Sequence, residues 1–295
     1  MIEIKNLVKN YGDIVAVNDL SFKVNKGELF AFLGVNGAGK STTINIICGL
    51  LEKTSGEIYF NGQLTKPNDN FIKEKIGIVF QSSCLDNPLS VLDNLKHRAS
   101  LYGIFGNEFK AKLAELTTLF DLKDILNRPI KALSGGQKRK VDIARALIHS
   151  PEILILDEPT TGLDPQTRKR IWQVLNDKRK QNLTIILTTH YMEEANEADY
   201  VVIIDSGKKV ACGTPLELKN KYLSDYIYLY NTSEESVKKL NLPYSQTQNG
   251  FIVPISNTLK AKELIIANPE LFVDFEIVKG KMDDVFLTVC GKELL

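Results

Sequence analysis

A short apolar run followed at once by a glycine-rich loop is the feature that most restricts how this chain can fold. Leu29–Leu33 has the length and character of a buried strand, and the loop after it reads GVNGAGKST. The order of strand, loop and helix matches the pattern G-x-x-x-x-G-K-[ST]. Its glycines let backbone N–H groups curl around phosphate oxygens, with a helix N-terminus behind them. The predicted phosphate contacts are Gly34, Val35, Asn36, Gly37, Ala38, Gly39, Lys40, Ser41 and Thr42.

Two side chains of this loop have distinct predicted roles. Lys40 is expected to reach the β- and γ-phosphates of a bound nucleotide. The Ser41 hydroxyl is expected to ligate Mg²⁺.

Two carboxylates follow a second apolar run. Ile153–Leu156 is continuous in apolar residues, as strands buried on both faces are, and it leads directly into Asp157 and Glu158. Carboxylates at the end of a buried strand beside a phosphate loop suit Mg²⁺-assisted phosphoryl transfer. We expect Asp157 to hold the water shell of the metal. Glu158 is expected to orient the attacking water or accept its proton.

A histidine ends a third buried run. His190 comes directly after Thr184–Thr189. Ligands of open α/β sheets bind at the carboxyl ends of the strands, so His190 is expected at the same edge as the loop and the carboxylates. There it would hydrogen-bond the γ-phosphate and hold the attacking water.

Composition excludes several other classes of protein. The chain has 295 residues, is 43% hydrophobic and 25% charged, and carries a formal net charge of +1. These values are typical of an ordinary globular protein and argue against bulk electrostatic binding of nucleic acid. The four cysteines form no C-x-x-C pair. Without a signal peptide or a long apolar run, the chain is expected to be cytosolic, and a membrane role requires another polypeptide.

The order of predicted elements indicates an α/β protein with two domains. Residues 1–220 are expected to form the larger domain, with antiparallel strands at its N-terminus and a helical insert at about 90–130. Residues 221–295 are expected to form a small α/β domain. Its predicted strands are Tyr226–Tyr230, Phe251–Ile255 and Phe272–Val278, and its predicted helices are Glu234–Leu240, Leu259–Ala267 and Met282–Val289.

The segment Leu133–Gln137 reads LSGGQ and places a serine cap and two glycines at the start of a helix, a second anion-binding terminus. Phosphate loop, LSGGQ, ILDEP and a downstream histidine, in that order, closely resemble the ATP-binding-cassette (ABC) ATPases. The resemblance covers about residues 1–220. It implies a P-loop NTPase cassette with a mixed central sheet, an N-terminal antiparallel β portion and a helical insert.

The resemblance implies further roles, with ATP and Mg²⁺ as cofactors. Tyr11 matches the aromatic residue that stacks on adenine. Gln81 matches the glutamine that senses Mg²⁺ and the γ-phosphate, so the implied metal site comprises Ser41, Gln81 and Asp157. Asp164 matches the aspartate that crosses the dimer interface. The implied contacts to the partner's nucleotide are Ser134, Gly135, Gly136 and Gln137.

The implied working unit is a head-to-tail dimer with two ATP molecules between the subunits, the partner being a second copy or a homologous ATPase subunit. Two kinds of function stay open: a transporter subunit, or a soluble ABC ATPase that acts on ribosomes or DNA. The segment from Lys40 to Ser134 has no sustained heptads of the coiled-coil kind that repair members carry, and the chain has one cassette rather than two. Transport is therefore favoured, and no nucleic acid partner is expected.

Three segments resemble the drug-resistance and sodium-efflux exporter branch: Gly135–Ala146, Thr160–Pro165 and Met282–Leu287. That branch often has Met where this chain has Gln137. It implies pairing with a separate six-helix ABC-2-type permease, at the cytoplasmic face of the membrane. For the C-terminal domain two interpretations stay open: it modulates dimerisation or docks on the permease, or it only covers the edge of the cassette.

Overall fold

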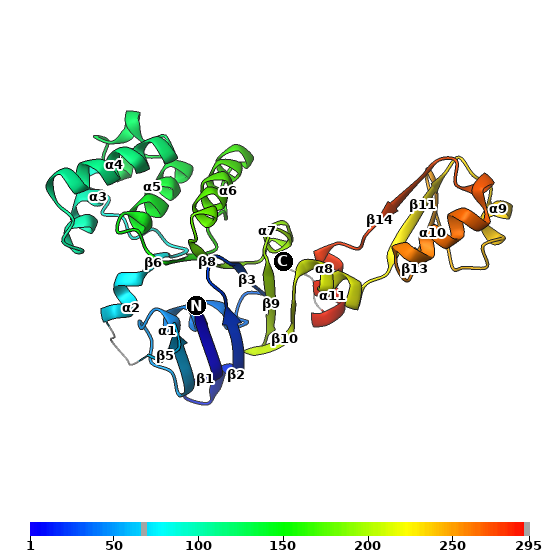
Figure 1. Ribbon diagram of the computed structural model, residues 1–295, viewed down its shortest axis with the longest axis horizontal. Coiled ribbons are helices and arrows are strands. Elements are labelled where there is room, and N and C mark those ends of the chain that lie inside the picture. The colour runs from blue at the N-terminus through cyan, green and yellow to red at the C-terminus, as the bar shows by residue number, and fades with distance from the viewer. Residues whose placement is uncertain (66–69, 292–295) are drawn as a thin grey trace. The chain divides into compact units, whose positions relative to one another are not determined.

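The computed structural model describes residues 1–65 and 70–291 (Figure 1). Contacts divide the chain into two compact units, Met1–Lys209 and the part from Val210 onward. The division falls inside β10 (Lys208–Gly213), before the residue-220 boundary expected from the sequence. The reason is that α8 (Pro215–Tyr222) packs on α11 (Met282–Cys290), so α8 belongs to the second unit.

The first unit begins with an antiparallel sheet in the order β2-β1-β4-β5. A two-residue turn, Gly12-Asp13, joins the first two strands, and Gly12 has the positive φ of 57° that such a turn favours. The expected N-terminal antiparallel portion is thus confirmed. Its strands are β1 (Ile2–Tyr11), β2 (Ile14–Val24), β4 (Ser55–Phe60) and β5 (Gln63–Leu64).

A second sheet forms the centre of this unit, and its strands β9-β3-β8-β7-β6 are all parallel. β10 returns beside β9 after the two-residue turn Ser206-Gly207, which makes the sheet mixed, as expected. Every residue of β3, β7 and β8 is buried, which explains their continuous apolar sequences. The parallel strands are β9 (Tyr200–Asp205), β3 (Leu29–Leu33), β8 (Thr184–Thr189), β7 (Ile153–Asp157) and β6 (Ile76–Val79).

One hydrophobic core joins the two sheets and α1 (Lys40–Ile47). The alternating apolar residues of β1 and β2 supply one side of this core, and β3 and β7 supply the other. Phe22 of β2 packs edge-on against Phe32 of β3, with ring centroids 4.7 Å apart. The core fixes α1, and with it the loop that precedes the helix.

The remaining helices of the first unit include the expected helical insert, which Figure 1 shows as α3 and α4 beside α5. Ser90 caps α3 and Ser134 caps α5, each in a reciprocal capping box, and Asp164 caps α6. Among the described residues, no helix has both the length and the apolar character needed to cross a lipid bilayer. The helices are α2 (Asn70–Lys75), α3 (Val91–Ser100), α4 (Gly106–Phe120), α5 (Gly135–Leu147), α6 (Pro165–Lys180) and α7 (Met192–Asn196).

The second unit contains an antiparallel sheet in the order β12-β13-β11-β14, with its own hydrophobic core. The strand predicted at Phe272–Val278 begins later, at Phe275, because Pro269–Leu271 forms a 3₁₀ turn and the Phe272 ring is buried in the core. The elements are β11 (Asp225–Tyr230), β12 (Ser245–Thr247), β13 (Gly250–Ile255), β14 (Phe275–Val278), α9 (Glu234–Lys238) and α10 (Thr258–Ala267), besides α8 and α11.

Because each unit has its own core, damage to one core is expected to leave the other unit folded. Leu229 is fully buried in β11, so Leu229→Ala should destabilise the second unit by about 2–5 kcal/mol. The measurement is urea unfolding, with nucleotide affinity as the readout for the first unit. Tyr228→Ala, on the other face of the strand, is the control and should lower the free energy of unfolding by a smaller amount. A large loss of nucleotide affinity in Leu229→Ala would contradict independent cores.

Candidate functional site

Four predicted motifs meet at one edge of the central sheet. The loop follows β3, His190 follows β8, Asp157 ends β7, and Gln81 lies two residues beyond β6. These four strands are adjacent and parallel, with Leu33 beside Thr189 and Asp157 beside Thr188. Their carboxyl ends therefore lie together, where α/β sheets bind ligands. We call this group the sheet-edge cluster: Gly34–Thr42, Gln81, Asp157, Glu158 and His190.

The loop depends on two glycines that lie against other backbone segments. A Cβ on Gly34 would lie 2.5 Å from the carbonyl oxygen of Ile204, and one on Gly39 would lie 2.5 Å from that of Ala16. Gly39 also has a φ of 102° and immediately precedes α1. No side chain caps the first turn of α1, and no acidic residue lies in it. The amide end of this helix is thus left without a protein anion, as a phosphate site requires.

Lys40 is buried, with only 5% of its surface exposed. Its Nζ donates hydrogen bonds to the carbonyl oxygens of Gly34 (2.7 Å) and Val35 (3.2 Å). Burial lowers the pKa of Lys40, while the charges of Glu158 and Asp157 raise it. The ammonium group therefore lies inside the loop, where the charge of a bound polyphosphate would be favourable.

Oxygen donors suitable for Mg²⁺ lie between the loop and β7. Ser41 Oγ is 3.5 Å from Asp157 Oδ1, and the Thr188 hydroxyl donates to the same carboxylate oxygen. Within the described part of the chain, no three His, Cys, Asp or Glu side chains cluster as metal ligands. Mg²⁺ is commonly held by one or two protein oxygens, with phosphate and water completing its shell. The side chains present therefore fit a nucleotide-bound magnesium ion.

Glu158 is surrounded by polar groups of the other strand ends. Gln81 Nε2 donates to Glu158 Oε2 at 3.2 Å, and the Thr161 hydroxyl donates to the same oxygen at 3.4 Å. His190 Nδ1 lies 3.3 Å from Glu158 Oε1, but without the alignment of a hydrogen bond. The structure thus brings Glu158, Gln81 and His190 together.

The backbone of Glu158 is in a left-handed conformation, with a φ of 46°. Such a conformation costs a non-glycine residue about 1–3 kcal/mol and persists only where the surroundings impose it. The Glu158 N–H donates to both the carbonyl oxygen and the hydroxyl of Thr188, each at 3.1 Å. Positive φ also occurs at ordinary turns of this chain, but at Glu158 it lies within the sheet-edge cluster, and backbone strain is known to cluster at functional sites.

Arg139 is a residue of this site to which the sequence assigned no role. It extends from α5 and is 8% exposed. Its guanidinium donates to the carbonyl oxygens of Pro159 and Phe80 (2.6 Å each) and of Asp157 and Glu158 (3.0 Å each). Burial lowers its pKa, opposed by Asp142 and the site carboxylates. The sequence signal that could have indicated its burial is its helical spacing with Ile143 and Ala146, two apolar residues that are buried on the same face of α5.

Five other predicted residues form a second group, which we call the helix-start cluster: Ser134, Gly135, Gly136, Gln137 and Asp164. Ser134 and Gln137 bond each other in the capping box, and Asp164 Oδ1 accepts from the Thr167 N–H at 2.9 Å. Hydrogen bonding by the Thr167 side chain, and then by its backbone, lowers the pKa of Asp164. A Cβ on Gly136 would lie 3.2 Å from the Thr167 side chain, whereas one on Gly135 would meet nothing within 4 Å. The start of α5 therefore offers an open face.

Tyr11 lies in the β1–β2 hairpin, whose Ala16 carbonyl approaches Gly39. Its side chain is 48% exposed, and Lys9 Nζ lies 4.9 Å from the ring centre. Stacking on adenine stays a prediction for this residue.

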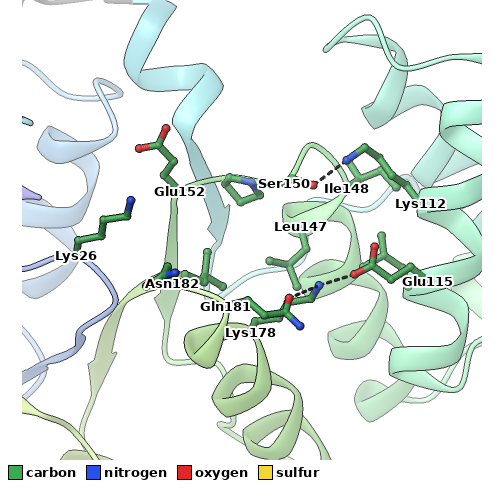
Figure 2. A pocket seen from close by; sticks show the side chains of 13 residues that line it. Lys26, Lys112, Glu115, Leu147, Ile148, Ser150, Glu152, Lys178, Gln181 and Asn182 are labelled. Atoms are coloured by element: carbon green, nitrogen blue, oxygen red, sulfur yellow. Dashed lines mark hydrogen bonds and ion pairs between the residues drawn. The ribbon is translucent and has the colours of Figure 1, made fainter.

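A cavity of about 420 Å³ lies at the opposite edge of the central sheet (Figure 2). It is lined by residues that precede β7 and β8, among them Glu152 and Leu183, and so is separate from the sheet-edge cluster. Two of its three lysines are paired: Lys112 donates to the Ser150 hydroxyl at 2.7 Å, and Lys178 bonds Glu115. The chemistry expected of a nucleotide site lies in the sheet-edge cluster.

Comparison with known proteins points to the same chemistry. A family model described as ABC transporter matches residues 17–161. Nod factor export ATP-binding protein I of Cupriavidus pinatubonensis is 33% identical, over 100% of this chain and 92% of that protein. The linearmycin resistance ATP-binding protein of Bacillus subtilis is 36% identical, over 93% of this chain and 85% of that protein.

Solved structures show the same fold. An ATP-binding subunit of an ABC transporter has a TM-score of 0.70 and 31% identity, over 75% of this chain and 93% of that one. A dimeric ATP-binding cassette in a post-hydrolysis state, bound to ADP and phosphate, has a TM-score of 0.66 and 30% identity, over 72% of this chain and 98% of that one. The chain belongs to the ATP-binding subunits of ABC transporters, and it is an ATP hydrolase of that family.

Proposed function

We propose that this chain is the motor subunit of an ABC exporter of the ABC-2 type. Two copies, or one copy and a homologous ATPase subunit, would clamp two ATP molecules head to tail. The observation that carries the proposal is the separation of the predicted site into a sheet-edge cluster and an outward-facing helix-start cluster. The γ-phosphate needs donors on the side that its own loop leaves open. Ser134 and Gly135 of a second subunit would supply them.

In this proposal the loop Gly34–Thr42 binds the phosphates through its backbone, and Lys40 contributes the positive charge. Ser41, Gln81 and Asp157 would hold Mg²⁺. The ion supplies neutralisation of the charge that develops on the phosphate oxygens. Tyr11 would stack on the adenine ring.

Glu158 is the proposed general base. It would orient the attacking water and accept its proton, and His190 would hold that water against the γ-phosphate. The close approach of His190, Gln81 and Glu158 supports these roles. Asp164 would lie at the subunit interface, where ATP binding closes the dimer and phosphate release opens it.

The relatives are named for Nod factor export and linearmycin resistance, which favours transport over action on ribosomes or DNA. We propose that a separate transmembrane permease binds this subunit at the cytoplasmic face of the membrane. The first unit would form the cassette, and the second unit, from Val210 onward, an accessory domain that either modulates dimerisation or docks on the permease, or only covers the edge of the cassette.

The role of Lys40 is tested by Lys40→Ala. Hydrogen bonds to charged groups contribute about 1.5–3 kcal/mol, so the affinity for ATP should fall about tenfold or more. Titration calorimetry measures this loss. Lys112→Ala, which removes a lysine of the separate cavity, should leave the affinity unchanged. Equal affinities in both variants would mean that the phosphate loop has been assigned wrongly.

The role of Glu158 is tested by Glu158→Gln. The variant should bind ATP, lose turnover by about 10²–10⁴-fold because the proton acceptor is gone, and accumulate as an ATP-bound dimer. Phosphate release and light scattering measure the two effects. Glu193→Gln, which removes the exposed carboxylate that pairs with Arg168, is the control and should remain active. A Glu158→Gln protein that stays monomeric in saturating ATP would refute the proposed clamp.

A further inference from the structure

The guanidinium of Arg139, on α5, hydrogen-bonds the segments at the ends of β6 and β7. Within the described residues it donates to no carboxylate, and its donors are instead used by four backbone carbonyl groups. One belongs to Phe80, directly before Gln81, and the other three belong to Asp157, Glu158 and Pro159. A buried arginine with this many carbonyl partners fixes the relative position of the segments that it joins.

Arg139 donates its hydrogen bonds to the turn Asp157–Pro159, which contains the strained backbone of Glu158. Glu158 has its left-handed backbone between two carbonyl groups that accept from the same guanidinium, while its N–H is held from the other side by Thr188. A strained conformation persists only when its surroundings over-determine it. Arg139 and Thr188 are the groups that do so here.

We propose that Arg139 is a positioning residue for ATP hydrolysis: through the backbone it holds the Glu158 and Gln81 side chains opposite each other. The inference rests on the proposed role of Glu158 as general base. Arg139 touches no reacting atom, so it acts through Glu158.

The same contact joins the catalytic turn to α5. Arg139 lies in the second turn of the helix that Ser134 caps. A shift of α5 when Ser134 engages a nucleotide would therefore reach the Glu158 carbonyl through one buried, hydrogen-bonded side chain. This places a mechanical connection between the helix-start cluster and the sheet-edge cluster inside each subunit.

A lysine at position 139 cannot make the same set of hydrogen bonds. Its ammonium is a single point with three donors, whereas the guanidinium presents five in a fixed plane. Arg139→Lys keeps the charge and most of the volume but should release at least one strand end. A misplacement of about 1 Å in a catalytic group costs about 10²-fold in rate.

The test compares Arg139→Lys and Arg139→Gln with Arg145→Lys. Arg145 lies on the same helix, is largely buried and faces Asp142 at 3.8 Å, but bonds none of these carbonyl groups. Both Arg139 variants should lose kcat by about 10²-fold, with affinity for ATP changed by no more than about twofold. When combined with Glu158→Gln, they should still dimerise in ATP. Arg145→Lys should keep its kcat.

An unchanged kcat in the Arg139 variants would overturn the inference, and so would an equal loss of kcat in Arg145→Lys. It would also be overturned if kcat, ATP affinity and thermal stability fell together in the Arg139 variants. Failure of both Arg139 variants to fold would likewise assign the residue a purely structural role. The proposed function fails differently, because it requires ATP-dependent dimerisation of Glu158→Gln with Arg139 intact.

Discussion

The parallel pairing of four buried strands is the constraint on which the rest of the site depends. Because β3, β8, β7 and β6 run in one direction, the groups that follow them gather at one edge although they are far apart in sequence. The backbone ladder and the core beneath it set these positions. Strand pairing alone brings the loop, Lys40 and Asp157 together. The left-handed backbone of Glu158 additionally depends on the hydrogen bonds of Arg139 and Thr188.

Much of this arrangement could be predicted from the sequence, because its signals are local. The glycines of the loop, the continuous apolar strands and the Ser134 cap each specify their own geometry within a few residues. Short elements such as β10 and α7 carry too little pattern to be seen. Phe272 misled for a physical reason: an apolar residue that is buried after a turn looks the same in sequence as the first residue of a strand.

Residues whose role arises only in three dimensions could not be assigned in advance. Arg139 lies in a basic run, Lys138-Arg139-Lys140, that is typical of a solvated helix face, yet it is buried against carbonyl groups. No local sequence pattern predicts that the carbonyl groups of Phe80 and Pro159 accept hydrogen bonds from Arg139. Thr188 likewise lies in an ordinary strand, and only the pairing of β7 with β8 brings its hydroxyl to Asp157.

The proposed head-to-tail dimer requires that the phosphate loop of one subunit and Ser134 of another enclose the same nucleotide. Disulfide cross-linking can detect this arrangement, with two differently tagged preparations in a cysteine-free background, one carrying Asn36→Cys and the other Ser134→Cys. Both positions are exposed. In Glu158→Gln protein with ATP, oxidation should give a mixed-tag disulfide dimer that is absent without nucleotide. No mixed-tag product, despite ATP binding by both preparations, would contradict the claim.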